Sequence, residues 1–179
     1  AAADFFIQAL SKSLAGKKSK DHRSVMIHAQ TVRDDQLDDM AAMNVIPSYF
    51  SAHTFYWGDW HRDSVLGLER GSRISPTASS LAKGITFTVH NDAPIVPPDV
   101  MRLVWATSNR LTRSGKVLGS SERISVEEAL KAVTVNAAYQ YFEEDRKGSI
   151  EVGKQADFVL LSANPLRIAK EDLLNIKVL

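Results

Sequence analysis

The sequence contains no cysteine among its 179 residues. A disulfide framework and a thiolate metal site are therefore excluded, and a metal would have to be held by histidine, aspartate, glutamate or a modified lysine. No stretch approaches the roughly 18 consecutive apolar residues of a membrane span. An excess of one charge is also missing, since 22 Lys and Arg nearly balance 21 Asp and Glu, and this balance disfavours a nucleic-acid partner.

What is present has the composition of an ordinary globular domain. Hydrophobic residues make up 44% and charged residues 24% of the chain, so we expect neither disorder nor membrane residence, and a cytoplasmic type of protein is favoured. The N-terminus lacks the charged and apolar regions of a signal peptide. Residues 1–6 instead resemble the inside of a helix, and we expect the native protein to begin upstream of them.

The spacing of apolar residues predicts alternating helices and short strands. Residues 4–20 are expected to form a helix followed by a loop in the basic run 16–20. Further helices are expected over 34–41, 75–83, 99–111 and 125–139, the last with Ser125-x-x-Glu128 as a capping box. The expected strands cover residues 24–29, 44–47 and 85–89, and an irregular aromatic loop is expected over 49–61. This order is typical of an α/β fold with a parallel sheet.

The character of the chain changes after Arg146. Short apolar runs punctuated by glycine, as in Gly148-Ser149-Ile150 and Val152-Gly153, predict short strands and turns. We therefore expect one unit over residues 1–146 and a second over 147–179.

Three side chains suited to chemistry follow the predicted strands. His28 ends the first, His53 lies in the aromatic loop after the second, and Asp92 follows the third. Because parallel strands end at one edge of a sheet, we expect all three on one face. They could hold zinc or a similar divalent metal that activates a water molecule, with Asp92 able to take its proton. Spacing alone leaves a structural role open for each histidine.

Four segments strengthen this hypothesis because their sequences resemble, in the same order, segments of the amidohydrolase superfamily. They are His28-Ala29-Gln30, residues 52–59, His90-Asn91-Asp92-Ala93-Pro94 and residues 148–157. The closest branch is family 3, which includes the N-substituted formamide deformylases and proteins labelled exoenzyme regulators. The resemblance covers essentially the whole chain.

The resemblance implies a partial (β/α)8 barrel, with strands similar to strands five to eight, joined to strands of a small β-sandwich. It implies that His28, His53 and Asp92 are ligands of a zinc or other divalent metal centre, and that Asp92 is also the catalytic proton shuttle. The implied reaction is hydrolysis of a C–N bond in an amide, formamide or cyclic amide.

The chain also departs from the pattern that it resembles. No two of its five histidines are two residues apart, so the first-strand His-x-His pair is absent, and no bridging carboxylate or carboxylated lysine is identified. Ile27 stands where glutamate is usual and Asn91 where serine is usual. A half-barrel leaves parallel edge strands exposed. We therefore expect self-association or a complementary N-terminal half, and the alternative is an inactive or regulatory remnant.

The remaining candidates are two aromatic residues and three histidines. Tyr56 and Trp57 are candidate substrate-binding residues in the aromatic segment, although they could simply cap the barrel mouth. His90 is favoured as a structural or supporting residue rather than a ligand, and His22 and His61 are interpreted as surface residues.

Overall fold

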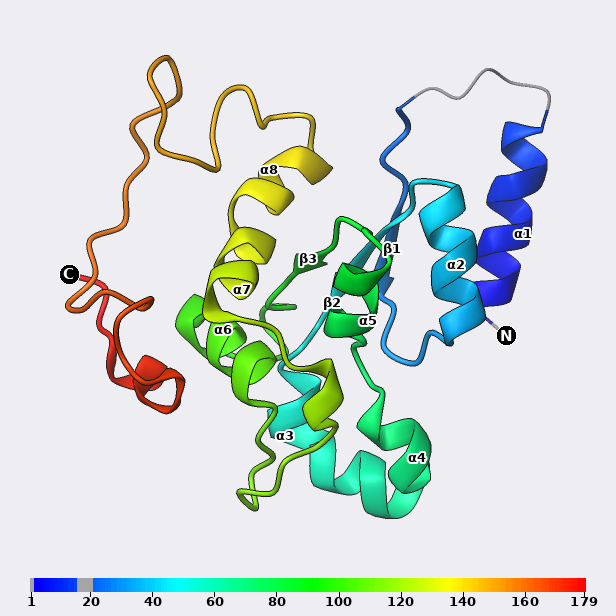
Figure 1. Ribbon diagram of the computed structural model, residues 1–179, viewed down its shortest axis with the longest axis horizontal. Coiled ribbons are helices and arrows are strands. Elements are labelled where there is room, and N and C mark those ends of the chain that lie inside the picture. Colours follow the sequence, from blue (N-terminus) through cyan, green and yellow to red (C-terminus); the bar gives the residue numbers. More distant parts are fainter. Residues whose placement is uncertain (1, 16–20) are drawn as a thin grey trace.

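The computed structural model describes residues 2–15 and 21–179 (Figure 1). The helices are α1 (Ala2–Leu14), α2 (Asp34–Ala42), α3 (His53–Trp60), α4 (Gly67–Ser72), α5 (Thr77–Ala82), α6 (Val100–Asn109), α7 (Val126–Val133) and α8 (Val135–Gln140). Shorter helical turns are η1 (His61–Val65), η2 (Ser120–Glu122) and η3 (Lys170–Asn175), and the strands are β1 (Val25–His28), β2 (Ile46–Tyr49) and β3 (Thr88–Val89).

The strands form one parallel sheet in the order β1-β2-β3. All three strands predicted from apolar runs are present, with β2 beginning two residues and β3 three residues later than expected. Every residue of β2 is buried, as befits a central strand covered on both faces. The fold is therefore mixed α/β with a small parallel sheet. The fourth strand implied by the resemblance is not found in the described residues, because the chain between β2 and β3 folds into helices.

The aromatic segment is helical, and the prediction of an irregular loop was wrong. Helix α3 runs over His53–Trp60 and continues into a wider helical turn at His61–Val65. Phe50, His53 and Trp57 are three and four residues apart, so their rings meet on one side, with centroids 4.5 Å apart for Phe50 and His53 and 5.5 Å for His53 and Trp57. A local aromatic cluster thus favours a helix here, although the segment contains the turn-forming residues Gly58 and Asp59.

The first predicted helix is present and ends at Leu14, and the loop predicted over the basic run 16–20 lies outside the described residues. The helix expected over 125–139 is divided at Thr134, whose hydroxyl donates to the carbonyl of Leu130. Because this threonine lies between Val133 and Val135, three consecutive β-branched residues disfavour a continuous helix there.

The C-terminal arm, which we define as residues 148–169, is made of turns and extended backbone. Its strand-like pairing among the described residues is a single antiparallel bridge between Leu161 and Val178, so the sandwich strands expected there are not found in the part of the chain that the structure describes. Beyond the arm, η3 packs on α6: Trp105 Nε1 donates to the carbonyl of Glu171, and Leu173 is fully buried. Figure 1 shows the arm, in orange, far from β1.

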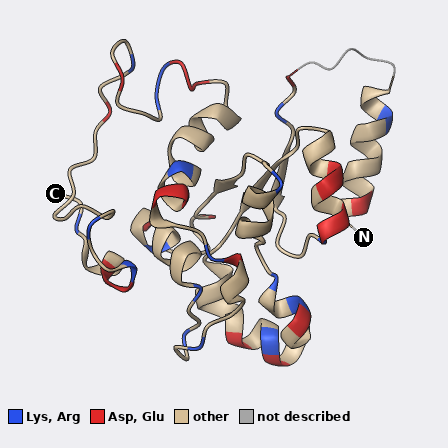
Figure 2. Ribbon diagram, viewed as in Figure 1, with Lys and Arg blue, Asp and Glu red and all other residues tan. Residues whose placement is uncertain are grey.

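Charged side chains lie mostly on the helices and loops. Figure 2 shows acidic residues gathered on α2 and at the start of α1, whereas the three strands carry none. Among the described residues, no helix is both long and apolar enough to cross a membrane.

Candidate metal centre

The carboxyl ends of β1 and β3 bring two predicted site residues together. His28 is the last residue of β1, and Asp92 follows the end of β3. Both have a backbone in the left-handed region, with φ of 66° and 58°, a conformation that residues other than glycine adopt rarely and at a cost of about 1 kcal/mol or more. Backbones held in this way are concentrated at functional sites, where the surrounding structure compensates the strain.

The side chains of these residues face a common space. His28 Nε2 lies 3.8 Å from Asp92 Oδ2, which is too far for a hydrogen bond. His28 Nδ1 lies 3.0 Å from His90 Nε2. Each of His28, His90 and Asp92 offers one ligand atom, and these atoms lie within 4.8 Å of one another. Imidazole nitrogen and carboxylate oxygen are the donors that zinc accepts in a chain without cysteine.

His53 lies next to this group at the start of α3. Its ring centroid is 5.8 Å from that of His28, and its Nδ1 is buried without a hydrogen-bond partner among the described residues. Burial lowers the pKa of His53 to about 4, and the neighbouring His61 and His28 act in the same direction. The ring is therefore neutral at neutral pH and keeps a lone pair. An unpartnered buried nitrogen with a free lone pair fits a metal ligand.

The other two histidines near the centre differ in their contacts. His90 uses both ring nitrogens, with Nδ1 2.9 Å from Ser48 Oγ and Nε2 on His28, and burial lowers its pKa to about 4. His61 is half-buried, and its ring lies 5.8 Å from that of His53, so its interpretation as a surface residue was wrong. The helical turn η1 orients His61 toward His53, whereas an irregular loop would not have fixed this orientation.

The two predicted substrate-binding residues lie at different distances from the centre. Trp57 stands edge-on to both Phe50 and His53, with ring centroids 6.1 Å and 5.5 Å away. Tyr56 lies beside Trp57 with its ring tilted by 46° and the centroids 5.5 Å apart, and the Arg113 guanidinium lies 5.2 Å from the centroid of the Tyr56 ring. Trp57 therefore borders the histidines directly, whereas Tyr56 forms the next layer.

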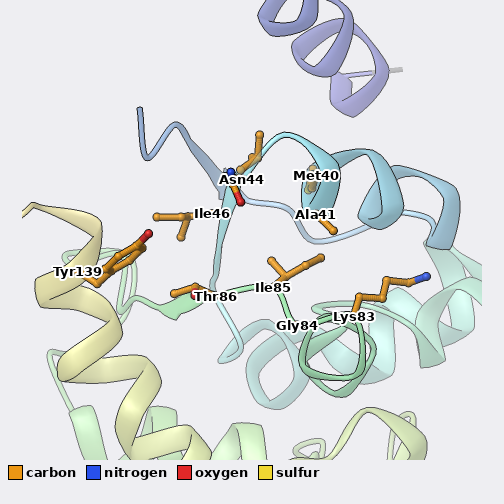
Figure 3. Close-up of a pocket in the computed structure, with 10 residues that line it drawn as sticks. Met40, Ala41, Asn44, Ile46, Lys83, Gly84, Ile85, Thr86 and Tyr139 are labelled. Carbon is orange, nitrogen blue, oxygen red and sulfur yellow. The ribbon is translucent and has the colours of Figure 1, made fainter. Parts of the chain in front are cut away.

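A small cavity of about 100 Å³ lies at the opposite end of the sheet (Figure 3). Asn44 and Ile46 line it at the start of β2, together with Thr86 before β3 and Tyr139 on α8. Its one ionisable group besides Tyr139 is Lys83, which pairs with Asp34 and Asp38. It has no cluster of ligands or catalytic groups, and the carboxyl end of the sheet remains the candidate site.

Comparison with known proteins gives consistent matches. The sequence profile of the amidohydrolase family matches residues 1–179. The chain is 28% identical over 130 residues to the N-substituted formamide deformylase of Arthrobacter pascens, a match covering 70% of this chain and 23% of the relative. It is 30% identical over 160 residues to the Bacillus subtilis protein YtcJ, which is named as an amidohydrolase, covering 85% of this chain and 30% of that protein.

A solved structure has a similar fold. An uncharacterized metal-dependent hydrolase from Pyrococcus furiosus superimposes with a TM-score of 0.74 at 27% identity, covering 93% of this chain and 32% of that one. The chain thus spans less than a third of the length of each of these proteins.

Proposed function

Because the chain belongs to the amidohydrolase family, we propose that it is the C-terminal part of a metal-dependent hydrolase that cleaves C–N bonds in amides, formamides or cyclic amides. The observation that carries the proposal is the convergence of His28 and Asp92 at one sheet edge, 3.8 Å apart and facing each other without a hydrogen bond. The relative named as an N-substituted formamide deformylase supports the choice of bond.

The residues of the chain divide the work between holding a cation and moving a proton. His28 Nε2, Asp92 and His53 would hold a divalent cation such as Zn²⁺, which polarises a carbonyl and lowers the pKa of water when bound. Asp92 is half-buried. Its carboxylate can hold a proton released by the attacking water and pass it to the leaving nitrogen.

The rest of the site positions and encloses a small substrate. Trp57 would supply an apolar wall beside His53, with Tyr56 behind it. Residues 147–179 would contribute strands to a small sandwich domain completed by a complementary N-terminal half. That half would also supply the ligands that this chain lacks.

A second function is favoured by one observation. The sequence has no His-x-His pair, and the described residues hold a single ligand group, of three side chains. An inactive or regulatory remnant would show this pattern. It would bind no metal with useful affinity.

Metal analysis after dialysis distinguishes the two functions. We expect the chain to retain about one Zn²⁺ and to lose it in His53→Ala and Asp92→Asn, because each change removes a donor. The matched control is His22→Gln, since His22 bonds the carbonyl of Met43 at 2.8 Å and contacts none of these donors. Metal content that is absent in the parent chain, or unchanged in both donor variants, would favour the remnant.

A further inference from the structure

A hydrogen bond joins the end of β1 to the helix that carries His53. Gln30 Nε2 lies 3.1 Å from His61 Nε2. Gln30 follows the predicted ligand His28 by two residues, and His61 lies on the same continuous helix of α3 and η1 as His53. Among the described residues, no other hydrogen bond joins residues 25–33 to residues 53–66. The segments that carry these two predicted ligands are therefore linked through Gln30 and His61.

The chemistry of the amide determines the direction of this bond. The Nε2 atom of Gln30 belongs to an NH2 group, which only donates, so His61 Nε2 must accept with its lone pair. The single proton of the His61 ring is then on Nδ1. His61 Nδ1 is buried and has no hydrogen-bond partner among the described residues. Within that part of the chain, the bond from Gln30 is the only hydrogen bond that fixes the His61 ring.

The backbone around Gln30 holds its side chain in place. His28 and Ala29 both have a left-handed backbone, with φ of 66° and 44°, which turns the chain sharply where β1 ends. The carbonyl of Gln30 then accepts from the backbone N–H of Ser75 at 2.8 Å. Because the main chain of Gln30 is already bonded, its side chain is left to reach His61.

The other partner is carried by a helix that moves as one piece. The backbone N–H of Leu66 donates to the carbonyl of His61 at 2.8 Å, which closes the wide turn η1. Turns of this width are rare and are frequent at functional sites. Helix α4 packs closely on η1, since a Cβ atom on Gly71 would lie 3.2 Å from the Cα atom of Arg62. A bond at His61 therefore acts on α3 and η1 together.

The position of α3 sets the separation of two predicted ligands. The ring centroids of His28 and His53 are 5.8 Å apart. Two imidazoles on one tetrahedral Zn²⁺ have centroids about 5 Å apart, because each Zn–N bond is about 2.0–2.1 Å long. The rings are thus close to a shared arrangement. Metal sites need their donors held to within about 0.5 Å, so a small shift of α3 against β1 decides whether both rings reach one cation.

We infer that Gln30 is a positioning residue: by donating to His61 it holds α3 and η1 against the end of β1, and so sets the separation at which His28 and His53 reach one divalent cation. The inference rests on the metal site of the proposed function. It adds to that site a pair of residues, Gln30 and His61, that support the ligands without binding the cation.

NMR on the metal-free chain tests the inference directly, because only five histidines contribute. Long-range ¹H–¹⁵N correlation should show His61 with its proton on Nδ1, and a nuclear Overhauser cross peak should join the ring protons of His28 and His53. In Gln30→Met, which has no donor, we expect the Nε2–H form of His61 to appear and the cross peak to weaken.

A variant that reverses the bond separates positioning from a general effect on the fold. In Gln30→Glu the carboxylate accepts where the amide donated, so we expect a proton on Nε2 of His61 while the link is kept. The cross peak between His28 and His53 should therefore be retained. The matched control is Gln155→Met, since Gln155 is exposed in the C-terminal arm, and it should leave both signals unchanged.

The Zn²⁺ affinity measured by calorimetry shows whether Gln30 and His61 act as a pair. We expect Gln30→Met and His61→Phe each to lower the affinity about tenfold, at the low end of what supporting groups contribute. The double variant should also lose about tenfold, because both changes remove the same bond. Circular dichroism checks that each variant is folded at the temperature of the measurement. A loss in the double variant equal to the product of the two single losses contradicts a shared role.

The outcomes distinguish this inference from the proposed function. A parent chain with the proton of His61 on Nε2, or a Gln30→Met chain with an unchanged cross peak between His28 and His53, overturns the inference whether or not Zn²⁺ binds. If the NMR signals respond as expected while Zn²⁺ fails to bind even the parent chain, the proposed metal site falls and the positioning role of Gln30 stands.

Discussion

At the residue scale, Arg110 is the most deeply buried charge among the described residues, with 1% of its surface exposed. Its Nε donates to the carbonyl of Leu118 at 2.8 Å, and its two Nη atoms donate to the carbonyls of Ile74 at 2.8 Å and Ser75 at 3.2 Å. Burial lowers the pKa of Arg110 to about 10, so the group stays charged at neutral pH. It ties the chain before α5 to the chain after α6.

Replacing Arg110 should therefore destabilise the fold strongly. Arg110→Met leaves buried carbonyls without donors, each at about 1–3 kcal/mol, and we expect a loss of at least about 3 kcal/mol in the free energy of unfolding. Arg110→Lys should recover only part of this loss, because an ammonium lacks the planar fork of donors. Urea denaturation followed by circular dichroism measures the difference.

The control is Arg113→Met, three residues further along. Arg113 is exposed and lies over the rings of Phe55 and Tyr56 at 5.9 Å and 5.2 Å, so its loss should cost about 1 kcal/mol or less. Equal urea midpoints for Arg110→Met and Arg113→Met would contradict the structural role assigned to Arg110.

At the element scale, α7 illustrates how a short helix is anchored. Ser125 caps its first turn by accepting from the backbone N–H of Glu128 at 3.1 Å, as the sequence pattern predicted. The reciprocal half of the predicted capping box is replaced, since the Glu128 carboxylate accepts from Lys131 Nζ at 2.8 Å. The helix then buries Ala129 and Ala132 in contact with β3.

Removal of this cap should weaken the packing of α7. We expect Ser125→Ala to lower the free energy of unfolding by about 1 kcal/mol, because one N–H of the first turn loses its acceptor. Thermal unfolding by calorimetry provides the measurement. Ser125→Asp keeps an acceptor at the same position and should stay within about 0.5 kcal/mol of the parent chain, and a loss as large as that of the alanine variant would argue against capping.

At the scale of the whole molecule, two kinds of surface are incomplete. Among the described strands, β1 and β3 are the edges of the sheet, and Ile27 on β1 is 58% exposed. The C-terminal arm exposes large apolar side chains, namely Ile150, Val152, Phe158, Val159 and Leu160. Unpaired edges and apolar patches of this kind favour association with another chain.

We therefore expect the isolated chain to self-associate. Sedimentation velocity should show species larger than a monomer, and Phe158→Lys with Leu160→Lys should shift the distribution toward the monomer by removing apolar surface. Leu68→Lys is the control, because Leu68 is 67% exposed on α4, away from the arm and the sheet edges. A parent chain that remains monomeric, with β1 protected from hydrogen exchange, would contradict this expectation.

The sequence by itself determined the local elements and the family. Apolar runs of four to six residues identified the three strands, Ser125 identified the start of α7, and the motifs at residues 28–30, 52–59, 90–94 and 148–157 identified the amidohydrolase family. These features can be identified from the sequence because each depends on a short run of consecutive residues, through local conformational preference or through a recognisable motif.

Only the tertiary structure decided which distant groups meet. His28 and His90 are 62 residues apart and touch because parallel pairing aligns the ends of β1, β2 and β3. The contact of Ser48 Oγ with His90 Nδ1 at 2.9 Å has the same origin, whereas His61 is brought to His53 by the continuous helix of α3 and η1. The separation of residues along the chain does not indicate the order of the strands or the placement of the helices. The partners of each histidine are therefore determined only when the sheet has formed.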